Sequence, residues 1–364
     1  MRDDLGEPMR IGTLEVAAPI VCAPMAGGPT TPSLVAAVGE HGGLGMLAAG
    51  YLAPDALADL VAEVETLTTR PYGVNIFLSG QDALADGADA GALRDDVDRY
   101  RAVLAVEARR LDVELGAPRY TDERVAEKVD VLAAHRPALV SFTFGDPGAA
   151  LVERVHRDVG APVAVTVTSL PEARAAVASG ADALVVQGIE AGGHRGIWFD
   201  DPGDAAGGPR VPTAELVHSI TGAVDVPVIA AGGIGDGAAI AAMMSLGAVG
   251  AQLGTAFLCC DEARTSQPHR RALLERSFPD TVITRAFSGR PARSLRNGFA
   301  VRHRDGPAAY PQVHHVTKPL RAAATAAGDA DTINLWAGTG WRSVTTGPAA
   351  DLMSRLTAEL LDRP

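Results

Sequence analysis

Short apolar runs alternate along this chain with segments whose apolar residues recur at helical spacing. Strands that are buried on both faces of a parallel sheet give such continuous runs, and helices usually connect them. The alternation therefore predicts an α/β protein built as a (β/α)8 TIM barrel. A doubly wound open sheet is the competing architecture, because it would produce the same alternation. The runs expected to form strands are 20–24, 44–48, 73–77, 139–144, 163–167, 183–187, 226–231 and 249–253.

Helix-start signals follow several of these runs. Thr31 is placed to cap a helix that has Pro32 at its first position. Ser169 with Glu172 matches a capping box, in which the two side chains satisfy free backbone N–H groups of the first turn. Asp236 can cap a helix over 240–246. These signals place helices between the expected strands, as a barrel requires.

Three parts of the chain do not fit the bare barrel pattern. A long charged stretch with helical spacing, from residue 92 to about residue 115, predicts a helical insertion within 80–120. The segment after the last run is rich in Arg and Pro and predicts a second, smaller α/β domain over the barrel mouth. The tail has the alternation of a final amphipathic helix over 349–361. The expected division is a barrel in 1–260, the smaller domain in 261–320, and a return segment with the final helix in 321–364.

Composition and charge narrow the class of protein. The chain has 364 residues, of which 47% are hydrophobic, and this length can hold a barrel and one smaller domain. The formal net charge of −12 argues against nucleic-acid binding, which needs clustered positive charge. No apolar run is long enough to span a membrane, and the first residues do not resemble a signal peptide. Cys22, Cys259 and Cys260 make no disulfide framework. We therefore expect a cytoplasmic monomer or homodimer with no nucleic-acid or membrane partner.

The most informative stretch is 187–196, which reads Gln-Gly-Ile-Glu-Ala-Gly-Gly-His-Arg-Gly after an apolar run. Gly192 and Gly193 precede its one histidine, and glycine lets a backbone approach a ligand closely. A histidine on such a loop, after a barrel strand, is placed as a catalytic acid or base would be. Imidazole also titrates near neutral pH. His194 is therefore the candidate catalytic residue, and the alternative interpretation is a turn with an incidental histidine.

A second glycine-rich stretch predicts a phosphate site. Gly232 and Gly233 follow the seventh run and open a helix, whose N-terminus favours an anion. The eighth run ends in Gln252, Leu253, Gly254 and Thr255, and the loops after strands seven and eight of barrels commonly hold a phosphate. The spacing lacks the fingerprint of dinucleotide-binding loops. A tight turn without a ligand is the alternative.

Polar residues at other strand ends suggest what carries the phosphate. Asn75 and Gln187 end two of the runs, and an amide can both donate to and accept from a heterocycle. One phosphate site together with amides at the barrel rim favours FMN over NAD as the cofactor. No His, Cys and acidic spacing typical of a metal site occurs, so we expect no metal. The polar, glycine- and proline-rich stretch 199–212 predicts a lid or binding loop.

Four motifs occur together in this order: 23–28, Ala-Pro-Met-Ala-Gly-Gly; 73–77, Gly-Val-Asn-Ile-Phe; 141–147, Ser-Phe-Thr-Phe-Gly-Asp-Pro; and 187–196. On these the chain resembles the class I nitronate monooxygenases, formerly called 2-nitropropane dioxygenases, over most of its length. The resemblance implies an FMN-bearing barrel with a small substrate domain and His194 as the catalytic base. It implies flavin contacts from Pro24, Met25, Asn75, Gln187, Gly192, Gly233, Gln252, Leu253, Gly254 and Thr255.

The later segment 310–319 is similar to the lining of that family's substrate domain. The resemblance implies that Tyr310 and Lys318 face the substrate pocket, and His314 stands where a second tyrosine is expected. The activity implied is oxidation of alkyl nitronates by O2 to a carbonyl compound and nitrite. His194 would first remove the α-proton when the substrate is a neutral nitroalkane. Protonated His194 or Lys318 would attract the anionic nitro group.

Other functions share this fold, and fold alone does not separate them. The chain is also similar to flavin-dependent enoyl-acyl-carrier-protein reductases and to some NADH:quinone reductases, so an NAD(P)H-dependent flavin reductase is the first alternative. A lyase or isomerase that binds a phosphorylated substrate without a cofactor is the second. A non-catalytic flavin carrier is the third, and it would leave His194 without a role.

Overall fold

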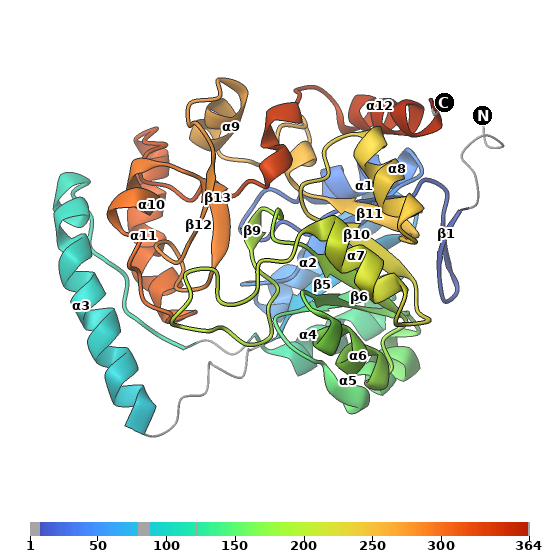
Figure 1. The fold of residues 1–364 in the computed structure, drawn as a ribbon, viewed down its shortest axis with the longest axis horizontal. Coiled ribbons are helices and arrows are strands. Elements are labelled where there is room, and N and C mark those ends of the chain that lie inside the picture. Colours follow the sequence, from blue (N-terminus) through green and yellow to red (C-terminus); the bar gives the residue numbers. More distant parts are fainter. Residues whose placement is uncertain (1–7, 79–87, 121–122, 363–364) are drawn as a thin grey trace.

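The computed structural model describes residues 8–78, 88–120 and 123–362. Its centre is a closed barrel of parallel strands, surrounded by helices (Figure 1). The barrel closes because β11 pairs with β10 on one side and with β3 on the other. This closure confirms the predicted TIM barrel and excludes the open sheet. The strands are β3 (Ile20–Cys22), β4 (Leu44–Ala48), β5 (Tyr72–Phe77), β6 (Leu139–Thr143), β7 (Val163–Val167), β8 (Ala183–Gln187), β10 (Val228–Ala231) and β11 (Gly250–Leu253).

The helices of the barrel begin where their capping residues predict. The Thr31 side chain accepts from the backbone N–H of Leu34, and Asp236 does the same for the third residue of its helix. The Ser169 side chain accepts from the N–H of Glu172. The helix after Asp236 starts at residue 237, so it is longer at its start than the predicted 240–246. The helices are α1 (Pro32–Glu40), α2 (Pro54–Leu67), α4 (Val125–His135), α5 (Gly148–Arg154), which continues as the π-helix η2 (Val155–Val159), α6 (Leu170–Ala178), α7 (Thr213–Thr221) and α8 (Gly237–Ser245).

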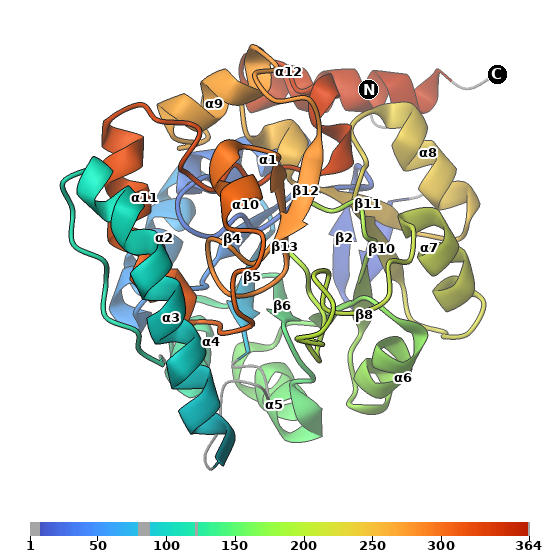
Figure 2. The same ribbon diagram turned by 60° about the vertical axis from the view of Figure 1, so that its left-hand side comes forward.

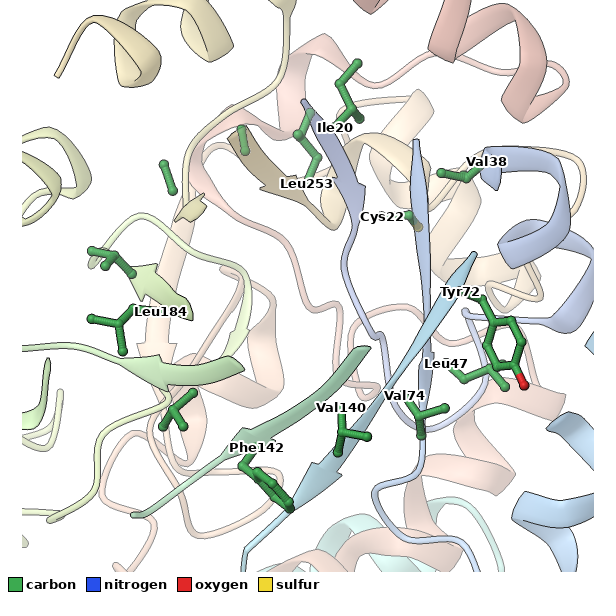
Figure 3. Packing of buried hydrophobic residues seen from close by; sticks show 14 of the residues in the cluster. Ile20, Cys22, Val38, Leu47, Tyr72, Val74, Val140, Phe142, Leu184 and Leu253 are labelled. Atoms are coloured by element: carbon green, nitrogen blue, oxygen red, sulfur yellow. The ribbon is translucent and has the colours of Figure 1, made fainter. Parts of the chain in front are cut away.

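Alternate residues of the strands build two apolar layers. Figure 3 shows the outer layer, where Ile20, Val74 and Phe142 point from the strands toward the helices. The residues between them, such as Val21 and Met46, point the other way and fill the barrel interior. The interior is closed at one end by a hairpin that the apolar pattern did not predict, β1 (Met9–Ile11) with β2 (Leu14–Val16). The barrel is therefore packed throughout, and only its other end is available for a ligand.

A smaller unit covers the open end of the barrel, and the inserted helix is part of it. The helix α3 (Ala88–Arg110) lies away from the barrel, beside α11 (Figures 1 and 2). Its Tyr100 and Leu104 share an apolar core with Phe287 and Phe299. The other elements of this unit are α9 (Gln267–Leu274), β12 (Thr281–Thr284), β13 (Ala292–Leu295), α10 (Gly298–Arg302) and α11 (Gln312–Ala326).

The chain then returns to the barrel. The 3-10 turns η3 (Thr255–Phe257) and η4 (Thr339–Ser343) lie against each other, and the final helix α12 (Ala349–Leu361) packs on α1 and α8. The predicted helix over 349–361 is thus confirmed. The helix α11 runs through residue 320 without a break, and the division of the chain at residues 260 and 320 stays a proposal. Within the described segments, no helix has both the length and the apolar character that crossing a membrane requires.

The helix α1 packs so closely on β4 that a substitution at their contact tests this packing. A Cβ added at Gly45 would lie 2.5 Å from the carbonyl oxygen of Val35, so Gly45→Ala must push α1 away from the barrel. We expect this change to lower the free energy of unfolding by about 1–3 kcal/mol, the usual cost of overpacking. The matched control is Gly91→Ala on α3, where an added Cβ meets nothing within 4 Å. We expect the control to be neutral or slightly stabilising in denaturant unfolding, because alanine favours helix more than glycine does. Equal stability of the two variants would contradict this packing.

Candidate active site

A cavity of about 750 Å³ lies where the barrel strands end and the smaller unit begins. This is the end of a TIM barrel that carries the active site in characterised enzymes. The volume is typical of a site for a small molecule or cofactor. The residues named as candidates from the sequence that line it are Pro24, Met25, Asn75, Gln187, Gly192, Gly193, His194, Gly232, Gly233, Gln252, Leu253, Gly254, Thr255, His314 and Lys318.

Asn75 presents an unused acceptor to this cavity. Its side chain is 2% exposed, and its Nδ2 donates to the Ser141 hydroxyl at 2.8 Å and to the Thr143 hydroxyl at 3.0 Å. Its Oδ1 has no hydrogen-bond partner among the described residues. An unpaired acceptor in a buried site costs free energy unless a ligand supplies a donor. Asn75 therefore suits the N–H edge of a heterocycle.

Gln187 holds the histidine loop in place. Its Nε2 donates to the backbone carbonyl of His194 at 3.2 Å, and its Oε1 accepts from the N–H of Gly196 at 2.7 Å. A side-chain amide has two N–H donors, so one remains for a ligand. The loop conformation and the cavity lining thus depend on the same side chain.

His194 is not on an irregular loop. It belongs to a short strand, β9 (Gly193–His194), which pairs with β13 of the smaller unit, so that His194 lies opposite Ala292. The imidazole Nε2 is 2.8 Å from the hydroxyl oxygen of Ser288. The ring is also 5.3 Å from that of Trp336 and 5.7 Å from that of Tyr310, measured between centroids. His194 is therefore held between the barrel and the unit that covers it.

The imidazole of His194 is neutral in this setting. Burial, and then the charges of Arg290 and Arg321, lower the pKa of His194 to about 3. His194 therefore supplies no positive charge before a substrate binds, and its attraction for an anionic nitro group stays a prediction. Positive charge comes instead from Lys318 and Arg321, which both line the cavity from α11. No Asp or Glu is among the described residues that line the cavity, so the site is suited to an anion although the whole chain is acidic.

A glycine turn lines the cavity where the sequence predicts a phosphate site. The backbone at Gly232 and Gly233 has φ of 117° and 73°, a conformation that glycine adopts without strain. Two first-turn donors of α8 are already used, because the N–H of Gly237 donates to Glu359 and that of Ala239 to Asp236. That the N-terminus of α8 receives a phosphate stays a prediction, and the glycine turn before this helix lines the cavity.

The return segment supplies a part of this region that the sequence did not predict. The N–H of Gly338 donates to the hydroxyl of Thr255 at 2.9 Å, and the N–H of Thr339 donates to the carbonyl of Glu190. Gly338 and Gly340 line the cavity beside Gly233. Only the glycines of this segment could have indicated from the sequence that it lines the cavity, and glycines are also common at turns that bind no ligand.

On the substrate side, the structure separates the three candidates. His314 and Lys318 line the cavity from successive turns of α11. Tyr310 is not among the lining residues; its ring packs behind the cavity, 5.7 Å from the ring of His194 and 6.5 Å from that of Tyr51. Tyr310 therefore supports the site in this structure. Lining residues that the sequence analysis missed include Tyr51, His269, Ser288, Arg321, Asn334 and Trp336.

The stretch 199–212 does not reach the cavity. Arg195 donates to the carbonyl oxygens of Ala206 and Pro209, and Arg285 forms a buried ion pair with Asp200. No residue of the stretch is in the cavity lining. The expected lid or binding loop is therefore held away from the cavity by Arg195 and Arg285.

A closed barrel whose covered mouth offers a neutral imidazole, an unpaired amide oxygen and a glycine cradle defines a TIM-barrel oxidoreductase site. The family model described as nitronate monooxygenase matches residues 10–359. The chain belongs to this family of flavin-dependent oxidoreductases, and it is an enzyme. This membership disfavours both the cofactor-free lyase and the non-catalytic carrier.

Individual relatives agree with the family. The chain is 38% identical to a nitronate monooxygenase of Paraburkholderia phytofirmans over 99% of this chain and 97% of the relative. It is 36% identical to a probable nitronate monooxygenase of Staphylococcus aureus over 95% of each. Among solved structures, nitroalkane oxidase from Streptomyces ansochromogenes matches with a TM-score of 0.88 and 46% identity, covering 94% of this chain and 95% of that one. FabK from Thermotoga maritima matches with a TM-score of 0.72 and 28% identity, covering 95% and 93%.

The neutral imidazoles of the cavity predict a pH-dependent stability. The pKa values of His194, His269 and His314 are lowered to about 3, 4 and 2, mainly by burial, whereas an unfolded histidine has a pKa of about 6.5. At a pH between the folded and the unfolded pKa, the unfolded chain binds protons that the folded protein does not bind. We therefore expect the free energy of unfolding to fall as the pH is lowered from 7 to 5, by up to about 1.4 kcal/mol per pH unit for each imidazole below its unfolded pKa. Denaturant unfolding of the protein and of His269→Gln at both pH values tests this, because the variant should show the shallower dependence.

Proposed function

We propose that this enzyme uses FMN to oxidise alkyl nitronates with O2, giving a carbonyl compound and nitrite, and that it accepts neutral nitroalkanes through proton abstraction by His194. The observation that carries the proposal is the neutral imidazole of His194 on the wall of a cavity that contains cationic side chains and no carboxylate among its described lining residues. A neutral base and a positive surrounding are what the conversion of a nitroalkane into an anionic nitronate needs.

The residues present fit FMN. The unpaired Oδ1 of Asn75 and the free N–H of Gln187 suit the polar edge of the isoalloxazine ring. The glycine turn at Gly232 and Gly233, with Gly254 and Thr255 after the neighbouring strand, suits a single phosphate. Pro24, Met25, Gly192, Gly193, Gln252 and Leu253 complete the proposed contacts. When bound, the flavin supplies the transfer of electrons from the nitronate to dioxygen.

The hydrogen bond of His194 indicates which nitrogen acts as the base. Its Nε2 is bonded to the hydroxyl of Ser288, which also lies 3.3 Å from the carbonyl oxygen of Arg290. If Ser288 donates to that carbonyl, it accepts from Nε2–H, and the lone pair is on Nδ1. No described residue forms a hydrogen bond with Nδ1. We therefore assign proton abstraction to Nδ1.

Before the reaction, the pKa of His194 is lowered to about 3. Abstraction of a proton creates the nitronate anion beside the new imidazolium, and an opposite charge at contact raises the pKa of the imidazole. Lys318 and Arg321 stabilise the same anion from α11. The base is therefore neutral when the substrate arrives, and it gains proton affinity only as the product charge develops.

An NAD(P)H-dependent flavin reductase is the second candidate. The observation that favours it is the pair Arg264 and Lys318, which are exposed while lining the cavity and could hold the phosphates of a dinucleotide. Anaerobic mixing separates the two functions. Bleaching of the bound flavin by NADPH and not by a nitronate would support the reductase, and the opposite result supports nitronate oxidation.

A cytoplasmic location and a monomeric or homodimeric state complete the proposal. The three cysteines are free and buried, which is ordinary for a protein kept in a reducing compartment. The proposed partners are a small nitronate or nitroalkane and O2.

The base role of His194 predicts a selective loss of activity in His194→Asn. We expect turnover of a neutral nitroalkane to fall by about 10²–10⁴-fold, the usual contribution of general-base catalysis, while turnover of the preformed nitronate changes far less. The yellow flavin should be retained. The matched control is His218→Asn, which changes an exposed histidine on α7 and should leave both activities intact. An equal loss on both substrates would argue against the base role.

A further inference from the structure

His314, on α11, lines the cavity, but the proposed reaction gives its side chain no role. Its ring is stacked on that of Tyr51, with centroids 4.4 Å apart and planes at 10°. Tyr51 lies on the loop between β4 and α2, and its backbone N–H donates to Glu123 at 3.3 Å. The barrel and the smaller unit thus both determine the plane of the His314 ring.

Arg321 determines where the proton of that ring is. Its Nη2 lies 3.3 Å from the Nδ1 of His314, and its Nε donates to the hydroxyl of Thr317 at 3.1 Å. Its Nη1 donates to the Oδ1 of Asn334 at 3.0 Å. A guanidinium only donates hydrogen bonds, so Nδ1 must be the acceptor and the proton of the neutral ring must be on Nε2. No described residue forms a hydrogen bond with Nε2.

The surroundings keep the ring in this form and strengthen it as a donor. Burial, followed by the charge of Arg321 and smaller effects of His315, His194 and Lys318, lowers the pKa of His314 to about 2. No carboxylate of the described residues lies within ion-pair distance of Arg321, whose four hydrogen-bond acceptors are all neutral. Hydrogen bonds in series polarise one another, so the guanidinium makes Nε2–H a better donor.

We propose that His314 is a specificity-determining hydrogen-bond donor for an oxygen of the nitronate or nitro group, and that Arg321 is the positioning residue that imposes its Nε2–H tautomer. This inference rests on the proposed function and deepens it. The resemblance leads one to expect a tyrosine at this position. A tyrosine hydroxyl can donate or accept a hydrogen bond, whereas the Nε2–H of His314 can only donate. The pair therefore selects ligands that present an anionic or strongly accepting oxygen at this end of the cavity.

His314→Phe tests the donor, because phenylalanine keeps the ring that stacks on Tyr51 and removes the N–H. We expect the KM for a preformed alkyl nitronate to rise about tenfold or more, the effect of losing a hydrogen bond to a charged group, with kcat changed much less. The control is His315→Phe, since His315 is next in the chain but is not in the cavity lining. An unchanged KM in His314→Phe would overturn the donor role.

Arg321→Met tests the positioning role without relying on turnover. Nitrogen-15 NMR of the imidazoles should show His314 protonated at Nε2 in the wild type and as a mixture of tautomers in Arg321→Met. Arg321→Lys retains a cationic donor and should restore part of the wild-type preference. A merely structural role of Arg321 would leave the tautomer unchanged, and wild-type protein protonated at Nδ1 would overturn the assignment.

Failure of the proposed function can be recognised separately. If the wild type oxidises no nitronate, the function is wrong, and the donor is then tested with nitrate, a planar anion whose oxygens resemble those of a nitro group. Calorimetric titration should show nitrate binding to the wild-type holoenzyme and weakening by about tenfold in His314→Phe, but not in His315→Phe. Absence of nitrate binding to the wild type, or equal binding by His314→Phe, would then overturn the inference as well.

Discussion

The pairing of β9 with β13 is the contact on which the site depends. It joins Gly193 and His194 of the barrel to Arg293 and Ala292 of the smaller unit by backbone hydrogen bonds. The pairing places His194 opposite Ala292 and so sets the position of the imidazole relative to the smaller unit. It also brings Ser288, which precedes β13, to the Nε2 of His194. The same contact thus joins the barrel to the smaller unit and orients the imidazole that we propose as the base.

The electrostatics of the cavity follow from this arrangement. Cationic side chains from α11 and three imidazoles line the same cavity, and burial, with added arginine charges at His194 and His314, keeps the imidazoles neutral. A folded protein keeps such an arrangement only at a cost in stability, because burial disfavours every uncompensated charge. An anionic substrate and a phosphorylated cofactor would both relieve that cost. The charge of the cavity, opposite in sign to that of the whole chain, is therefore the physical link between the fold and the proposed reaction.

The start of α8 has the sequence of an anion site, yet the carboxylates of Glu359 and Asp236 already accept from two of its first-turn donors. The preceding glycine turn and the return segment around Gly338 line the cavity beside it. Glu359 comes from α12, so the packing of the last helix on α8 decides which donors a cofactor can reach.

The sequence alone determined the features that depend on neighbours along the chain. The eight strands coincide closely with the apolar runs, and the caps at Thr31, Ser169 and Asp236 form as expected, because burial periodicity and capping are local properties. The motifs likewise placed most of the candidate residues at one end of the barrel. The hairpin of β1 and β2 escaped notice because its strands are too short to show a period.

Only the tertiary structure decided the contacts between distant residues. Ser288 reaches His194, and Asn334 binds the Arg321 that orients His314, yet no spacing in the sequence signals either contact. The protonation states of the imidazoles were equally out of reach, since a pKa depends on burial and on charges brought near by folding. Local pattern therefore places the chemical groups at one end of a barrel, while long-range packing decides which of them are neutral, which are paired, and which remain free to bind.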